Sequence, residues 1–176
     1  MPTVRTSDMK LKRLTRLSLL TGASLIMFII ELRFPDILPI PVKLGLANIV
    51  TVYAVYRYTA AETTMMLFAR IVLGALFSSN LFALIYSFSG AVLCLVGMLL
   101  IRKIVPVIFL WLCSIIGAVL HNIGQMAAAV VVTRSLSVLA YLPLLICAGV
   151  IAGAFTGICA QLMINRTGKI ENSETD

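Results

Sequence analysis

The chain has few of the residues that enzymes and metal sites depend on. It contains a single histidine and only seven acidic residues in 176, and no two acidic residues are adjacent. One histidine and four cysteines without a CxxC or CxxH pairing do not provide the ligand spacing of a zinc site. No GxxxxGK[ST] motif is present, which excludes ATP binding by a P-loop. The sequence therefore predicts no metal, no cofactor and no catalytic residues.

Charged residues are also scarce. They make up 12% of the chain against 61% hydrophobic residues, which is far outside the range of soluble domains and indicates an integral membrane protein. The net charge of +7 does not indicate nucleic-acid binding, because the basic residues lie at the ends of apolar runs. We expect membrane lipid around the chain and no nucleic-acid partner. The four cysteines lie singly in apolar segments and are interpreted as small buried hydrophobes: Cys94, Cys113, Cys147 and Cys159.

The apolar segments predict an all-α bundle of six transmembrane helices. They cover about 17–32, 44–56, 62–79, 81–101, 105–132 and 143–165. The second is short, because a crossing needs about 20 residues, and we expect its first turn to begin in the preceding loop. That loop, 34–42, holds three prolines and cannot be a spanning helix. We expect it to cover whatever lies beneath it on the external side.

The distribution of basic residues predicts the orientation in the membrane. With six spans, ten Lys and Arg residues fall on the side of both termini and three on the other, with Arg70 left inside. The positive-inside rule then predicts that both termini are cytoplasmic. The domain organisation is a basic leader at 1–16, a membrane domain at 17–166 and a polar tail at 167–176, whose last six residues we expect to be disordered.

The fifth span carries the most unusual pattern of polar residues. At 100° per residue, one helical stripe holds the polar and small residues, namely Ser114, Ala118, His121, Gln125, Ala128, Ala129 and Val132, with Gly117 and Asn122 at its margins. The opposite stripe is aliphatic and is expected to face lipid: Ile116, Val119, Leu120, Ile123, Met126, Ala127, Val130 and Val131. Polar groups at bilayer depth are costly when unpaired, so they either line a ligand pocket or hydrogen-bond a neighbouring helix. The sequence leaves both alternatives open.

Arg70 stands near the middle of the third span, with Gly74 and Phe77 predicted on the same face. An arginine at this depth needs an anion, carbonyl groups or water, or else its side chain extends toward Glu62 at the membrane surface. We expect a pocket for a small molecule lined by Asn48, Arg70, His121, Asn122 and Gln125. In it Arg70 would favour an anionic group, and the amides would hold a carbonyl or a polar ring.

Small residues recur at four-residue spacing in two spans. Gly149, Gly153 and Gly157 in the last span predict close helix packing, and self-association through this strip is a weaker alternative. Ser18 and Gly22 form a shorter strip of the same kind in the first span.

Several stretches together resemble a known family. They are KLGLANIVTVYA at 43–54, ARIVLGALFSS at 69–79, YSFSGAV at 86–92 and SIIGAVLHNIGQ at 114–125, placed after a proline-rich loop. The chain resembles the Gx transporter family, six-helix bacterial proteins often labelled heptaprenyl diphosphate synthase component I. That family is similar to the S components of energy-coupling factor (ECF) transporters. The resemblance implies a bacterial plasma-membrane protein that captures a vitamin-like small molecule and relies on a coupling protein and ATPases, which would dock on Ser18 and Gly22.

The synthase label implies a second hypothesis, a membrane subunit associated with prenyl diphosphate synthesis. Prenyl diphosphate synthases share Asp-rich DDxxD motifs that hold magnesium, and this chain contains no Asp-Asp pair. We therefore expect the protein not to be an enzyme in either case, and to act as a substrate-binding subunit or as a non-catalytic partner of a synthase.

Overall fold

The computed structural model of the protein describes residues 3–33, 45–78 and 81–173. Within these ranges the regular elements are six α-helices and two 3₁₀ segments, with no strand. The helices are α1 (Thr3–Arg33), α2 (Leu46–Arg57), α3 (Ala60–Ser78), α4 (Leu81–Ile101), α5 (Leu110–Thr133) and α6 (Leu142–Ser173); the 3₁₀ segments are η1 (Val107–Phe109) and η2 (Leu136–Tyr141). The predicted all-α fold with six helices is confirmed.

Five helical segments of the described chain are long and apolar enough to cross a membrane. They are Leu11–Glu31, Ala60–Phe77, Leu84–Ile101, Val107–Thr133 and Leu136–Gly168. Their exposed residues are largely Leu, Ile, Val, Phe and Met, as expected for a surface that faces hydrocarbon. The chain is therefore a multi-pass membrane protein.

Helix α2 differs from the other five. Its 12 residues span about 18 Å, which is short of the roughly 30 Å of a bilayer core. Eight of its residues are buried, and it contacts α1, α3, α4 and α6. The helix begins at Leu46, after Gly45 in the left-handed conformation (φ 71°). The prediction that the first turn of this helix begins within the proline loop is wrong, because α2 begins at Leu46. The covering role of 34–42 lies outside the described residues.

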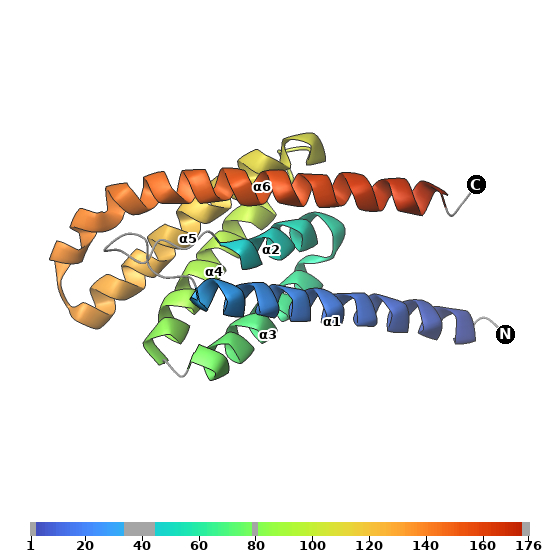
Figure 1. Cartoon of the computed structure of the whole chain (residues 1–176), viewed down its shortest axis with the longest axis horizontal. Coiled ribbons are helices and arrows are strands. Elements are labelled where there is room, and N and C mark those ends of the chain that lie inside the picture. Colours follow the sequence, from blue (N-terminus) through green and yellow to red (C-terminus); the bar gives the residue numbers. More distant parts are fainter. Residues whose placement is uncertain (1–2, 34–44, 79–80, 174–176) are drawn as a thin grey trace.

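Both ends of the chain are more helical than the sequence indicated. The basic leader is continuous with the first span, because α1 begins at Thr3. The prediction of a disordered tail is wrong for residues 171–173, since α6 continues to Ser173. The two termini lie at the same end of the bundle (Figure 1), as an even number of antiparallel helices requires.

Helix α5 is held between α4 and α6 by glycines on both sides. A Cβ atom added to Gly153 would lie 2.7 Å from Ile115 Cα, and one added to Gly157 would lie 2.6 Å from Trp111 Cα. On the α4 side, a Cβ atom on Gly124 would lie 2.7 Å from the Ser89 carbonyl oxygen. The glycine strip of α6 is thus covered by α5 of the same chain, which leaves it no free surface for self-association.

The cysteines take three different environments. Cys94 and Cys113 are buried in the core with Met98 and Leu110, and Cys159 is half-buried. Cys147 is exposed, so the prediction that all four are buried is wrong for this residue. It lies on α6, a membrane-span candidate of which only a small share is buried inside the protein.

Candidate functional site

A cavity of about 360 Å³ lies inside the bundle and is lined by residues of all six helices. The five residues that the sequence singled out all line it: Asn48, Arg70, His121, Asn122 and Gln125. They come from α2, α3 and α5, which are far apart in the chain. The walls between these polar groups include Ile71, Leu84 and Met126. A mostly apolar cavity with a few convergent polar groups is the usual form of a small-molecule site. That these five residues bind a ligand stays a prediction.

Arg70 is the cationic residue of this cavity, and its side chain is buried. Its Nη1 donates to three neutral oxygens over long distances, 3.4 Å to Asn48 Oδ1, 3.4 Å to Thr51 Oγ1 and 3.5 Å to Ser24 Oγ. No carboxylate among the described side chains lies within ion-pair distance of it. The alternative in which Arg70 extends toward Glu62 is wrong, because the buried Arg70 side chain donates to these three oxygens, while Glu62 pairs with Arg13.

Glu31 is a cavity residue that the sequence analysis missed. It lies at the end of the first predicted span, 17–32, where a carboxylate can reach water, but its side chain is buried and lines the cavity. It accepts a hydrogen bond from the backbone N–H of Gly45, which joins the end of α1 to the start of α2. The partner lies 14 residues away across a loop, so no local pattern could have indicated the contact.

The polar residues of α5 do not all play the same part. Asn122 Nδ2 donates to the Leu145 carbonyl oxygen of α6 at 2.6 Å, and the missing side chain of Gly149 leaves the room for it. Asn122 therefore holds two helices together at the cavity wall. His121 and Gln125 lie against Gly90 of α4, where an added Cβ atom would lie 2.8 Å from Gln125 Cγ and 3.0 Å from His121 Cε1.

Two face assignments from the sequence are wrong. Met126, assigned to the lipid stripe, is buried and lines the cavity, because α5 is covered by α4 on one side and by α6 on the other. Phe77 shares a helical angle with Arg70 but is 64% exposed. It lies seven residues further along α3, a rise of about 10 Å, and is not among the residues that line the cavity. Gly74, one turn from Arg70, does line the cavity.

Further lining groups come from α4 and α6. Tyr86, Ser87 and Thr156 add hydroxyl groups to the cavity. In the sequence Ser87 lies beside other small residues, and Thr156 directly precedes Gly157 of the glycine strip, so neither stands out as a cavity residue. Thr156 is in fact shared, since its hydroxyl also lies 3.0 Å from Ser114 Oγ.

The expected lack of a metal site and the docking strip on α1 both stay predictions. In the described part of the chain, no three His, Cys, Asp or Glu residues come together in a way that could hold a metal ion. The small strip of α1 is uncovered by the other described residues: Ser18 is exposed, and a Cβ atom on Gly22 would have nothing within 4 Å.

Comparison with known proteins identifies a family. No curated protein and no solved structure matches the chain. A family model described as heptaprenyl diphosphate synthase component I matches residues 20–163, which run from α1 into α6 and include every predicted cavity residue. This chain is thus a member of the heptaprenyl diphosphate synthase component I family.

Proposed function

We propose that the protein is a membrane-embedded, non-catalytic subunit that captures a small anionic or vitamin-like molecule in the cavity around Arg70. The supporting observation is a buried guanidinium group that meets only neutral oxygens among the described residues and faces a cavity of about 360 Å³. Pockets for small ligands typically measure a few hundred cubic ångströms. Glu31 lines the same cavity and interacts electrostatically with Arg70, but its carboxylate lies beyond ion-pair distance. A bound anion would therefore offset part of the cost of burying the guanidinium group.

The other polar side chains would orient the ligand. Arg70 presents a planar fork of donors that matches carboxylate or phosphate groups. Gln125, Tyr86 and Ser87 come from two further helices and can donate or accept hydrogen bonds. Ile71, Leu84 and Met126 would contact an apolar part of the molecule. The site therefore suits a compact molecule with one acidic group and a less polar body.

Energy for transport would come from a separate module. The resemblance to ECF S components implies a coupling protein with two ATPases, and the uncovered strip of Ser18 and Gly22 on α1 gives such a partner a close-packing surface. The excess of basic residues on the side of the termini supports cytoplasmic ends in a bacterial plasma membrane.

The family description supports one alternative function. A membrane subunit associated with prenyl diphosphate synthesis would recruit a soluble synthase to the bilayer. Purification from native membranes separates the two functions. An ATPase pair with a coupling protein in the purified complex supports transport, whereas a soluble prenyl synthase supports the alternative.

Ligand retention by cavity variants tests the proposed capture of an anion. Small molecules carried through purification in mild detergent are identified by mass spectrometry for the wild type, Arg70→Ala and Gln125→Ala. We expect an anionic compound that both variants lose while they remain folded. Gln161→Ala, which removes the same amide group from α6 outside the cavity, is the matched control and should retain it. Normal retention by both cavity variants would rule out this site.

A further inference from the structure

A second recess lies at the other end of α2 from the Arg70 cavity. It has a volume of about 500 Å³ and forms where the first half of α1, the end of α2, the turn between α2 and α3, and the residues directly after α4 meet. Its lining residues include four cations and no acid: Arg13, Val55, Tyr56, Arg57, Tyr58, Thr59, Arg102 and Lys103. The proposed capture of a small molecule around Arg70 makes no use of this recess.

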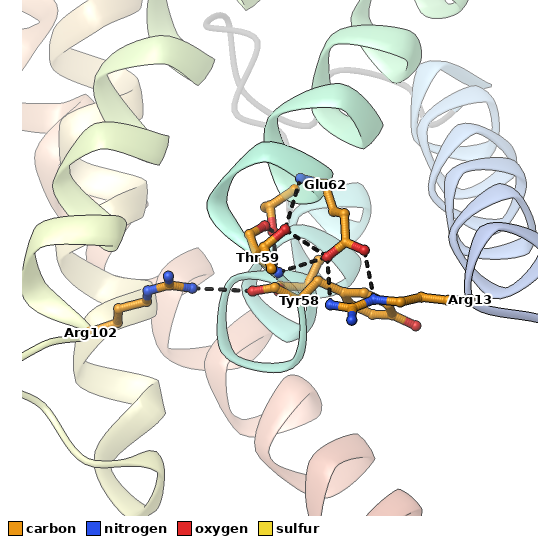
Figure 2. Close-up of polar contacts among 7 residues, drawn as sticks. Arg13, Tyr58, Thr59, Glu62 and Arg102 are labelled. Atoms are coloured by element: carbon orange, nitrogen blue, oxygen red, sulfur yellow. Dashed lines mark hydrogen bonds and ion pairs between the residues drawn. The ribbon is translucent and has the colours of Figure 1, made fainter. Parts of the chain in front are cut away.

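One wall of the recess is fixed by an ion pair (Figure 2). Arg13 Nε lies 2.6 Å from Glu62 Oε1, and its Nη2 donates to Oε2 at 2.7 Å. Glu62 also accepts hydrogen bonds from the backbone N–H and hydroxyl of Thr59, at 2.9 and 2.7 Å, and so caps the start of α3. The Arg13 guanidinium lies 5.9 Å from the centre of the Tyr58 ring. The charge of Arg13 is thus balanced, and its position is fixed.

Arg102 forms the opposite wall, and no acidic side chain among the described residues pairs with it. Its Nη1 donates to the carbonyl oxygens of Val55 and, at 3.3 Å, of Tyr58, both at the end of α2 (Figure 2 shows the second bond). These bonds hold the guanidinium in place but do not neutralise it, because carbonyl groups carry no net charge. Lys103 follows directly and is exposed. Among the described side chains, neither residue has an ion-pair partner.

The surroundings indicate which kind of anion fits. Leu100 and Ile104, on either side of this basic pair in the sequence, are 59% and 84% exposed. A membrane-span candidate ends at Ile101. The recess therefore lies where hydrocarbon gives way to headgroups, with apolar surface beside it for acyl chains. Basic pockets between transmembrane helices at this level are suited to acidic headgroups.

We propose that the recess binds the phosphate group of an acidic phospholipid, with Arg102 and Lys103 as its contacts and Arg13 and Tyr58 as a fixed wall. The cationic side chains favour binding of a phosphate group, and the adjoining apolar surface favours a lipid over a soluble phosphate. A lipid held there would bridge α1, the end of α2 and the residues directly after α4, at the end of the bundle that carries both termini.

Native mass spectrometry of the full chain in detergent tests this site. Dioleoyl phosphatidylglycerol and dioleoyl phosphatidylcholine are titrated separately, and we expect tighter binding of the anionic lipid. Lys103→Gln should weaken that binding about fivefold, the usual effect of removing one cation at a membrane surface. Arg102→Gln should weaken it at least as much, but it also removes the bonds to α2, so Lys103→Gln is the decisive variant. Arg166→Gln, near the same end on α6, is the matched control and should bind normally.

Three results would overturn the proposal. The first is equal binding of the two lipids, and the second is unchanged phosphatidylglycerol binding by Lys103→Gln. The third is a loss of phosphatidylglycerol binding in Arg166→Gln as large as that in Lys103→Gln. Inorganic phosphate is titrated alone as a further arm. If it binds in a Lys103-dependent way while phosphatidylglycerol does not, the recess is a site for soluble phosphate and the lipid assignment is wrong.

Discussion

At the scale of single residues, we expect Asn122 to contribute to helix packing and Gln125 to ligand binding. Both line the cavity from α5, but only Asn122 has a direct bond to α6, at 2.6 Å to the Leu145 carbonyl oxygen. We predict that Asn122→Ala lowers the free energy of unfolding by about 1–2 kcal/mol. Gln125→Ala should leave stability nearly unchanged and reduce ligand retention. Thermal unfolding in detergent and mass spectrometry of the retained ligand measure the two effects, and the reverse assignment would contradict the geometry.

The charge of Arg70 can be separated from its hydrogen bonds. Arg70→Gln keeps a donor toward Asn48 and Thr51 but removes the positive charge. Arg70→Lys keeps the positive charge but replaces the planar guanidinium group with a compact ammonium group. We predict that Arg70→Gln weakens binding of the anionic ligand about tenfold or more, in line with the 1.5–3 kcal/mol of a charged hydrogen bond. Arg70→Lys should lose less affinity for this ligand than Arg70→Gln. Isothermal titration with the identified ligand gives both affinities, and equal losses would mean that charge is not what the ligand recognises.

At the scale of helices, the glycines of α6 set the distance to α5. A Cβ atom on Gly153 would lie 2.7 Å from a backbone atom of Ile115, so the helices would have to separate. We predict that Gly153→Ala destabilises the protein by about 1–3 kcal/mol. Gly168→Ala, on the same helix, has nothing within 4 Å and should be neutral or slightly stabilising. Unfolding midpoints in detergent compare the two, and equal effects would contradict the packing.

The sequence predicted faces of helices better than it predicted their neighbours. The 100° period brought Ala118, His121 and Gln125 of α5 to one face, and all three line the cavity. The period alone could not show that α5 is covered on two flanks, which is why Met126 was assigned to lipid. The period gives the angle of a residue around α3 but not its distance from the cavity along the helix axis. For this reason Phe77 was grouped with Arg70. The burial of Glu31 depends on a contact across 14 residues and has no local signature.

At the scale of the whole molecule, the even number of helices places both termini on one side. We predict that a single cysteine introduced at Thr167, in a variant without the four native cysteines, is protected from a membrane-impermeant maleimide in intact cells. One at Ser135, in the turn between α5 and α6, should react. Labelling before and after lysis measures this, and the opposite pattern would reverse the orientation that the basic residues predict.

The fold was accessible from the sequence because hydropathy and proline positions determine the segments. Six helices, the shortness of α2 and the tight packing of the α6 glycines all follow from local composition. The extent of the cavity did not follow, because Glu31, Tyr86 and Thr156 reach it only through the arrangement of the helices. The sequence could predict that polar residues at bilayer depth line the cavity. It could not predict which of them contact Arg70.

The central claim is that Arg70 faces a chamber that holds an anionic molecule. An experimental density map of the protein purified with its native ligand tests this most directly. We predict non-protein density in the cavity within hydrogen-bonding distance of Arg70 and Gln125. Helices α3, α5 and α6 closed against one another, with Arg70 bound to a carboxylate of the chain and no space between them, would contradict it.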